Sequence, residues 1–245
     1  MFLPFSIFNI MKVVAFSDPH GYLAKVKDFP ECDVVCIAGD ICPLDIQRDL
    51  VESISWFLLT FKPWAESLPF KKVIFIGGNH DFFLWNIGLI ANNTGSSVIK
   101  KLLGQYKSSS KLVYLQDSSY EFEGKIFYGT PWIAQLVNWA FYLPPEKLEE
   151  KWSNIPKKCD VFISHMPPRI SDIGKVLQRG WNYGRDFGSQ ILADILQTRD
   201  IKYCLCGHVH SGQHFPVELN GTKYVNVSLK DEDYNVDYDL FEFEV

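Results

Sequence analysis

The stretch "KVVAFSDPHGYL" at residues 12–23 joins an apolar run to two polar side chains. Residues 12–16 predict a buried β-strand. Side chains at positions i and i+2 of an extended segment point the same way, so we expect Asp18 and His20 to project side by side from the strand end. Such a pair can bind a metal ion or can form an ordinary salt-bridged turn, and only the rest of the chain separates these interpretations.

Short apolar runs alternate with a helical pattern through the first third of the chain. Residues 12–16, 33–39 and 72–78 are rich in β-formers and bounded by turn residues. Between the last two runs, residues 45–68 carry apolar side chains at helical spacing and stop before Pro69. This alternation is typical of βαβ units with parallel strands.

The remainder of the chain predicts further strands and two helices. A hairpin turn is expected at Glu123-Gly124-Lys125, and helices are expected over 144–155 and 189–200. The expected strands are 111–116, 119–124, 125–132, 160–168, 201–210, 212–219, 222–229 and 238–245. We therefore expect an α/β (α+β) fold with two packed sheets, helices on the outer faces, and one domain over residues 1–245. Residues 1–11 are interpreted as an N-terminal extension or an appended strand.

The composition is that of an ordinary globular protein. The chain has 245 residues, 47% hydrophobic and 22% charged, with a formal net charge of −5. This length can bury a core without disulfides, and the acidic balance disfavours a dedicated binder of duplex nucleic acid. The six cysteines match no disulfide framework or zinc ribbon, so we expect reduced thiols and a cytoplasmic protein. The apolar N-terminus is too short to span a bilayer and lacks a basic start, so no membrane association is expected.

Polar residues recur at the ends of five expected strands. The motifs are "SDPH" (17–20), "GD" (39–40), "GGNHDF" (77–82), "SHMPP" (164–168) and "GHVH" (207–210). In open α/β sheets the carboxyl ends of the strands are where ligands bind. Taken singly, most of these motifs are typical of turns, but "GNHD" and "GHVH" have little packing purpose. Together they favour a metal site with seven candidate ligands: Asp18, His20, Asp40, Asn79, His165, His208 and His210.

The ligand types indicate the kind of metal. A mixed nitrogen and oxygen set without thiolate suits Mn, Fe, Zn, Co or Ni better than Ca or a structural zinc. Seven ligands are too many for one ion, whereas two divalent ions that share a bridging carboxylate would use them all. Ion pairs of this kind clamp an in-line displacement at phosphorus.

The order DPH … GD … GNHD … H … GHVH resembles the calcineurin-like metallophosphoesterase superfamily. A narrower resemblance lies in "YGTPWIAQLVNWAFYLPPEKLEEKWSNIPKKCDVFISHMPP" (128–168), which is similar to the metallophosphoesterase-domain-containing group and, through it, to class III cyclic-nucleotide phosphodiesterases. Some members of that group have lost a ligand histidine, but both histidines of "GHVH" are kept here. The Ser/Thr protein phosphatases carry arginines in GDxVDRG and RGNHE, and "GDICPLD" and "GGNHDF" lack them, which argues against that class.

The resemblance implies a four-layer αββα sandwich, with a dinuclear metal site at the carboxyl ends of the strands of two mixed sheets. It gives His80 the role of catalytic histidine, with Asp81 as its orienting partner. It assigns the ligands of one ion as Asp18, His20, Asp40 and His210, and those of the other as Asp40, Asn79, His165 and His208, with Asp40 bridging.

These observations predict a metal-dependent phosphoric ester hydrolase. The expected reaction is attack of a metal-bridging hydroxide on a small phosphodiester such as a cyclic nucleotide, with His80 donating a hydrogen bond to the phosphoryl group or protonating the leaving oxygen. A small-molecule phosphomonoesterase and a non-catalytic scaffold are the alternatives. Candidate substrate-binding residues are Trp132, Arg169, Trp181 and Arg185, although Trp132, Trp139 and Trp181 can equally be packing residues. The sequence says nothing of the oligomeric state.

Overall fold

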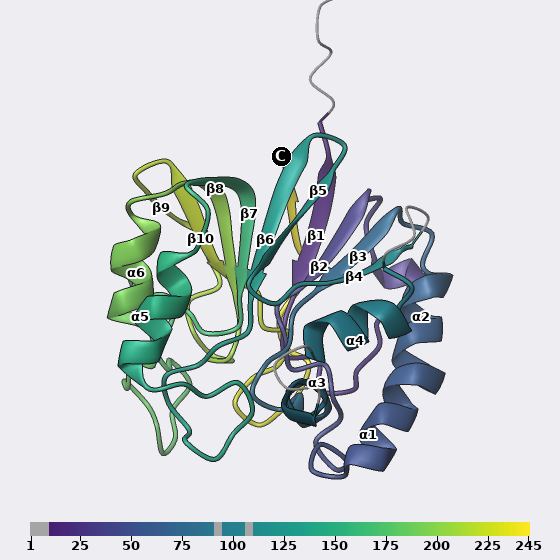
Figure 1. Cartoon of the computed structure of the whole chain (residues 1–245). Coiled ribbons are helices and arrows are strands. Elements are labelled where there is room, and N and C mark those ends of the chain that lie inside the picture. The colour runs from purple at the N-terminus through teal and green to yellow at the C-terminus, as the bar shows by residue number, and fades with distance from the viewer. Residues whose placement is uncertain (1–9, 91–94, 106–109) are drawn as a thin grey trace, which may run out of the picture.

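The computed structural model describes residues 10–90, 95–105 and 110–245. Two β-sheets pack face to face between two layers of helices, which confirms the predicted αββα arrangement (Figure 1). Residues 1–9 of the predicted N-terminal extension lie outside the described residues. Met11, which is described, is buried and exchanges two backbone hydrogen bonds with Val245 at the other end of the chain.

The first sheet has five strands in the order β11-β1-β2-β3-β4. Four of them are parallel, namely β1 (Lys12–Phe16), β2 (Val34–Ile37), β3 (Lys72–Phe75) and β4 (Leu112–Tyr114). The last strand of the chain, β11 (Phe241–Glu244), pairs antiparallel with β1. The parallel strands are buried almost throughout, as expected for strands covered on both faces.

The second sheet has six strands in the order β5-β6-β7-β8-β10-β9. The central four run parallel: β6 (Lys125–Thr130), β7 (Lys158–Ser164), β8 (Asp200–Cys206) and β10 (Thr222–Asn226). The edge strands β5 (Ser118–Phe122) and β9 (Val217–Leu219) are antiparallel to their neighbours. Glu123 and Gly124 form the predicted hairpin turn, both with the positive φ that a two-residue turn of this type requires. The strand expected over 212–219 is shorter, because only its last three residues pair.

Alternate residues of each strand build two separate cores. Val13 and Ala15 face the second sheet, where Val161 and Phe127 meet them, whereas the intervening side chains face the helices. The first sheet is covered by α1 (Leu50–Trp56), α2 (Lys62–Ser67), α3 (Phe82–Ile90) and α4 (Gly95–Leu102). The second sheet is covered by α5 (Pro145–Ser153) and α6 (Gln190–Leu196) (Figure 1).

The helix predicted over residues 45–68 begins later and contains a wide turn. Asp49 caps α1 by accepting hydrogen bonds from the amides of Val51 and Glu52. A π-helical turn (Phe57–Phe61) then leads into α2, whose second residue is Pro63. Proline has no amide hydrogen and clashes with the carbonyl four residues earlier, and the wider turn relieves that conflict. Within the described ranges, no helix combines the length and apolar character needed to cross a membrane.

Helices α3 and α4 had no counterpart in the sequence prediction. The segment "FFLWNIGLI" is apolar on nearly every side, so it shows no helical periodicity that could separate it from a buried strand. Its helical form places the start of α3 directly after the "GNHD" loop.

The two sheets meet at the carboxyl ends of their strands. Ser17, the residue after β1, donates its amide hydrogen to Val227 O at 2.7 Å and accepts from Leu229 N at 2.9 Å. The end of β1 is thereby joined to the segment after β10 in the other sheet. This junction brings the loops of both sheets into one region.

Candidate metal centre and active site

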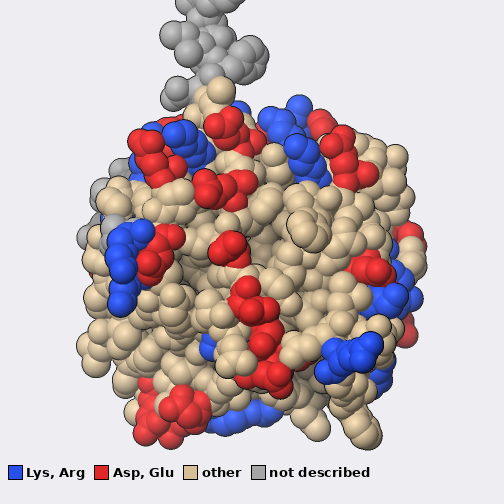
Figure 2. Space-filling model, turned by 180° about the vertical axis from the view of Figure 1, so that it is seen from behind, with Lys and Arg blue, Asp and Glu red and all other residues tan. Residues whose placement is uncertain are grey.

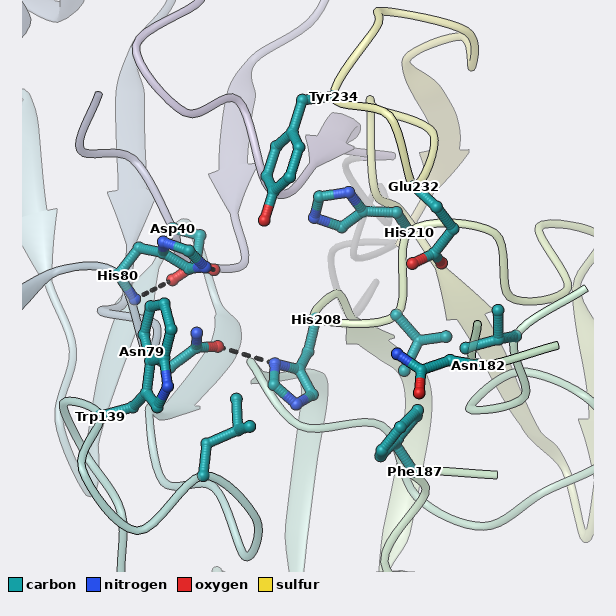
Figure 3. Close-up of a pocket in the computed structure, with 13 residues that line it drawn as sticks. Asp40, Asn79, His80, Trp139, Asn182, Phe187, His208, His210, Glu232 and Tyr234 are labelled. Carbon is teal, nitrogen blue, oxygen red and sulfur yellow. Dashed lines mark hydrogen bonds and ion pairs between the residues drawn. The ribbon is translucent and has the colours of Figure 1, made fainter. Parts of the chain in front are cut away.

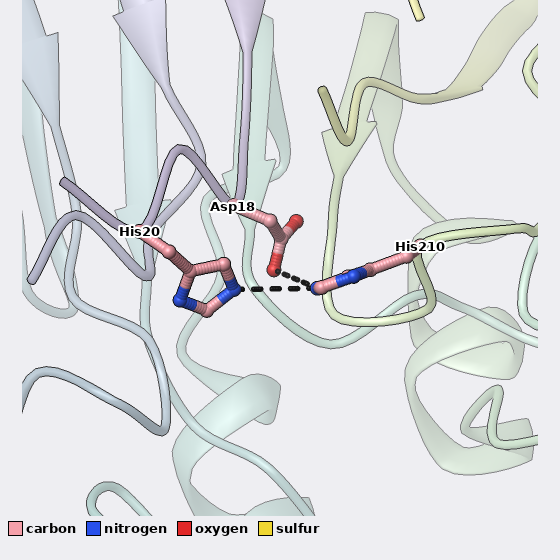
Figure 4. Close-up of side chains that lie close together, drawn as sticks. All are labelled: Asp18, His20 and His210. Carbon is pink, nitrogen blue, oxygen red and sulfur yellow. Dashed lines mark hydrogen bonds and ion pairs between the residues drawn. The ribbon is translucent and has the colours of Figure 1, made fainter. Parts of the chain in front are cut away.

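All seven candidate ligands lie in that region, on loops after β1, β2, β3, β7 and β8. Two pairs of side chains from opposite sheets define its first half (Figure 4). His20 Nε2 lies 3.3 Å from His210 Nε2, and His210 Nε2 lies 3.6 Å from Asp18 Oδ1. These three residues can hold one cation between them, since each offers a donor atom within 4.8 Å of the others.

Asp40 occupies the centre of the cluster. Its Oδ2 lies 3.3 Å from His165 Nε2, 3.8 Å from His80 Nε2 and 4.0 Å from His20 Nε2. Its Oδ1 accepts a hydrogen bond from the amide of His80 at 2.7 Å. A carboxylate so placed can be shared by two ions.

Asn79 completes the second half of the cluster. Its Oδ1 lies 2.9 Å from His165 Nε2 and 2.7 Å from His208 Nδ1 (Figure 3). The side-chain oxygen and two imidazole nitrogens therefore converge on one point beside Asp40.

The hydrogen bonds around the cluster fit a cation. His165 Nδ1 donates to Ala38 O at 2.9 Å, and His210 Nδ1 donates to Asp231 O at 2.8 Å. With Nδ1 donating outward, Nε2 of each ring faces the cluster, which is the arrangement that metal-ligating histidines use. His20 Nδ1 is buried without a hydrogen-bond partner among the described residues. A divalent ion would bind the Nε2 atoms that face the cluster.

The pKa shifts of most of these side chains favour the protonation state that binds a metal ion, namely a neutral imidazole or an ionised carboxylate. Burial lowers the pKa of His20 and of His208 to about 3, so both rings are neutral. Burial acts to raise the pKa of Asp40, but the charges of neighbouring histidines, His165 first, outweigh it and hold that pKa below its ordinary value. Burial also opposes protonation of His165, yet the Asp40 carboxylate raises its pKa to about 9. A cation would compete with that proton for the His165 nitrogen.

The backbone is strained where it presents the ligands. Asp18, His20, Asp40 and His208 have φ angles of 54°, 43°, 55° and 70°, in the left-handed region that non-glycine residues rarely adopt. Each such residue costs on the order of 1–3 kcal/mol and persists only where its surroundings impose it. Here the loops impose it on one another, since Asp18 N donates to Gly39 O at 3.1 Å and His20 N donates to Asp40 O at 3.0 Å.

Two glycines allow the loops to approach closely. A Cβ on Gly78 would lie 2.2 Å from Asp40 Oδ1, and one on Gly207 would lie 2.3 Å from Asp18 Oδ2. Any side chain at either position would displace a carboxylate of the cluster.

The His80 ring is held by Gln47, which lies outside the sequence motifs. Its Nδ1 lies 2.6 Å from Gln47 Oε1, and Gln47 is itself oriented by donating to Leu44 O at 2.9 Å. The Trp139 ring packs against the His80 ring with centroids 4.5 Å apart. His80 Nε2 is consequently the atom that faces Asp40 and the pocket.

Asp81 lies beneath the loops and not beside the His80 ring. Its carboxylate accepts from the amides of Gly78 (2.8 Å), Cys42 (2.9 Å) and Ile41 (3.3 Å). Burial, reinforced by the Asp40 charge, raises its pKa to about 7. Among the described residues the contact that orients the His80 ring thus comes from Gln47, and Asp81 joins the loop after β2 to the loop after β3.

A cavity of about 220 Å³ opens beside the cluster (Figure 3). It is lined by Asp40, Asn79, His80, Leu136, Trp139, Val176, Asn182, Phe187, His208, Val209, His210, Glu232 and Tyr234. Its walls are partly apolar, and no Lys or Arg is among the described residues that line it. Sequence analysis did not predict a role for three residues at the site, because they lie outside every motif: Gln47, Glu232 and Tyr234.

Two of the four predicted substrate-binding residues lie away from the cavity. Trp132 is only 5% exposed and donates its indole N–H to Asp117, and Arg169 forms an ion pair with Asp186 at 3.2 Å. Neither lines the cavity.

The other two predicted substrate-binding residues lie at its rim. Arg185 donates to Asn182 Oδ1 at 3.0 Å and stacks its guanidinium over the Phe187 ring. Trp181 is 95% exposed and lines an adjoining cavity of about 210 Å³, which shares Asn182 and Glu232 with the first.

The family model described as calcineurin-like phosphoesterase matches residues 11–212, which includes every candidate ligand. This chain belongs to the calcineurin-like phosphoesterase family. It is 29% identical over 238 residues to metallophosphoesterase domain-containing protein 1 of Homo sapiens, covering 89% of this chain and 66% of that protein. It is 30% identical over 245 residues to a UPF0046 protein of Caenorhabditis elegans, covering 97% of this chain and 82% of that protein. Both the superfamily and the narrower group predicted from the motifs are confirmed.

A solved structure shares the fold. Phosphopantetheinyl hydrolase from Mycobacterium tuberculosis superposes with a TM-score of 0.56 at 13% sequence identity, covering 95% of each chain. At that identity the likeness concerns the arrangement of sheets and helices, and it leaves the substrate of this chain open.

Proposed function

We propose that this chain is a metal-dependent phosphoesterase that hydrolyses small phosphodiesters, with cyclic nucleotides among the candidate substrates. The observation that carries the proposal is the convergence of seven nitrogen and oxygen donors from five loops on a buried cluster that borders a cavity. A structural role alone would not explain four strained ligand residues in one place.

Two divalent ions are the proposed cofactors. Asp18, His20 and His210 would hold one ion, Asn79, His165 and His208 would hold the other, and Asp40 would contact both. When bound, such ions lower the pKa of water and neutralise charge on a phosphoryl group. The donor set suits Mn, Fe, Zn, Co or Ni.

His80 is the proposed catalytic residue. Its Nε2 faces the cavity, because Gln47 engages Nδ1 and Trp139 supports the ring. Because Nδ1 keeps its proton for Gln47 Oε1, the doubly protonated ring can donate the Nε2 proton to the leaving oxygen, or hydrogen-bond a phosphoryl oxygen, and it is left neutral after the transfer. Asp81 would act indirectly, by holding the loops that carry Asp40 and His80 in register.

The walls of the cavity favour a substrate of low charge. A phosphodiester carries one negative charge, whereas a phosphomonoester carries close to two at neutral pH. The two proposed ions would supply the positive charge at the phosphate, and no Lys or Arg in the described lining would add to it to balance the second charge of a monoester. The lining therefore supports diesters over monoesters as substrates.

The leaving or retained alcohol of the substrate would extend toward the rim. There the exposed Trp181 offers a π-face for a planar group such as a nucleobase, and Arg185 offers a cation.

A duplex nucleic acid is not the expected substrate, because a duplex-binding protein presents a continuous basic surface. On the face shown in Figure 2 the Lys and Arg side chains form small separate groups, with acidic side chains between them.

The cytoplasmic location inferred from the cysteines also stays a prediction.

The test is a paired assay. Metal-stripped protein is reloaded with Mn²⁺ and supplied with bis-p-nitrophenyl phosphate and with p-nitrophenyl phosphate. Faster cleavage of the diester supports the proposal and leads to cyclic nucleotides as the next substrates. Faster cleavage of the monoester moves the function to a phosphomonoesterase. No cleavage of either by protein that holds two ions contradicts the proposal and favours a non-catalytic scaffold.

A further inference from the structure

Glu232 places a carboxylate in a cavity that is proposed to take an anion. It lies on the segment after β10, opposite His80 and Asn79, on the far side of His208 and His210 (Figure 3). An acid facing a phosphate ester weakens the binding of that ester, because like charges repel across a poorly screened pocket.

Glu232 is held firmly by one oxygen and leaves the other available. Its Oε1 accepts from Ser211 N at 2.9 Å and Ser211 Oγ at 2.8 Å, and its own amide donates to Gln178 Oε1 at 2.9 Å. No described residue donates a hydrogen bond to Oε2. The residue is therefore fixed in place with one free acceptor.

Asn182 supplies the complementary group on the same wall. Its Oδ1 accepts from Arg185 at 3.0 Å, which orients the amide, and no described residue accepts from its Nδ2. Both residues line the main cavity and the adjoining cavity that contains Trp181, so they stand at the boundary between the two.

A free acceptor and a free donor on one wall of the cavity match a hydroxyl group, which both donates and accepts. An ammonium group would satisfy Glu232 but offers no acceptor to Asn182. A second phosphate charge would be repelled by Glu232, and no Lys or Arg among the described residues of the main cavity offsets that repulsion; Arg179 lines the adjoining cavity only.

We infer that Glu232 and Asn182 form a specificity site that binds a hydroxyl group of the esterified alcohol, and that Glu232 excludes phosphomonoesters. The substrate class is thus a monoanionic phosphodiester of a hydroxyl-bearing alcohol such as a nucleoside. This inference rests on the proposed function and narrows its substrate.

The test compares wild type with Glu232→Gln on three esters that share the p-nitrophenolate leaving group. The p-nitrophenyl ester of thymidine 5′-phosphate is a diester with a free sugar hydroxyl, bis-p-nitrophenyl phosphate is a diester without one, and p-nitrophenyl phosphate is a monoester. Glu232→Asp keeps the charge, and Asp237→Asn is the matched control, because Asp237 is an exposed acid on the same segment that lines neither cavity.

In Glu232→Gln, kcat/KM for the thymidine ester should fall about tenfold, mainly through KM, because a charge-assisted hydrogen bond is lost. The value for bis-p-nitrophenyl phosphate, which carries half the charge of the monoester, should rise by only about threefold. The value for the monoester should rise roughly tenfold, because the repulsion is gone. Glu232→Asp should retain the discrimination against the monoester, and Asp237→Asn should behave as wild type on all three esters.

Calorimetric titration with inorganic phosphate at pH 8 provides a readout that needs no turnover. Glu232→Gln should bind this dianion more tightly than wild type by a similar factor. Equal ester ratios and equal phosphate affinities in a folded variant would overturn the inference while leaving the proposed function intact. If the wild type cleaves no ester, the proposed function fails, and the phosphate titration alone still judges the role of Glu232.

Discussion

Gly207→Ala should disrupt the metal cluster through a single methyl group. The added Cβ would lie 2.0 Å from Ser17 Oγ, 2.3 Å from Asp18 Oδ2 and 2.6 Å from Ser17 Cβ. Ser17 cannot move aside easily, because its backbone is hydrogen-bonded to the segment after β10 on both sides. Asp18 is fully buried, and its Oδ2 accepts from Ser228 Oγ at 2.7 Å, so it has little freedom either.

The expected loss of stability in Gly207→Ala follows from the free-energy cost of overpacking a rigid site. Such substitutions destabilise a protein by about 1–3 kcal/mol. In a chain of this size each kcal/mol lowers Tm by roughly 2–4 °C, so a fall of about 2–12 °C is expected. The His208 amide, now 3.1 Å from Asp18 Oδ2, would also be displaced, and metal affinity should fall about 10–100-fold.

The assay combines thermal melting of the metal-free protein with calorimetric titration of Mn²⁺. Gly180→Ala is the matched control, since a Cβ at Gly180 meets no atom within 4 Å. If Gly207→Ala has the same Tm as the wild type and binds Mn²⁺ as tightly, the packing argument for this loop is wrong.

The other predictions concern the cluster and the residues that support it. Asp40→Ala should bind at most one ion by elemental analysis and lose turnover, and a variant that keeps two ions would contradict the shared position of this carboxylate. His80→Ala should keep both ions but lose about 10²–10⁴-fold in turnover of bis-p-nitrophenyl phosphate, and near-normal turnover would remove it from the mechanism. Gln47→Ala should lower turnover by roughly tenfold without loss of metal, because it removes the 2.6 Å contact to His80 Nδ1; metal loss would instead indicate a structural role. Ser228→Ala should weaken Mn²⁺ binding about 10–100-fold through loss of its bond to the buried Asp18, whereas the exposed Ser153→Ala should bind as wild type.

The positions of the candidate metal ligands along the chain could be predicted from the amino-acid sequence alone. Five polar motifs each follow an apolar run, and the carboxyl ends of parallel strands meet at one edge of a sheet, so the sequence predicts that these motifs converge. The hairpin at Glu123-Gly124 was equally readable, because a turn of two residues with positive φ has a strong local signature. That residues 1–245 form one domain remains a prediction of the sequence.

The neighbours of each motif depend on the tertiary fold. Gln47 reaches His80 across 33 residues, and Asn182 and Glu232 share a wall although 50 residues separate them in the chain. Such contacts depend on the path of loops whose residues carry no periodicity, and periodicity is the signal that sequence analysis uses.

The same reason explains the positions of Asp81 and Trp132. A carboxylate next to a catalytic histidine in sequence need not contact it in space, and Asp81 turns toward three backbone amides that are buried beside it. Trp132 follows a strand like the metal ligands, but Asp117 engages its indole N–H and the ring packs in the helix-side core. Local pattern therefore fixed which residues could bind a metal, whereas long-range packing and the satisfaction of buried hydrogen-bonding groups decided which side chains face the cavity.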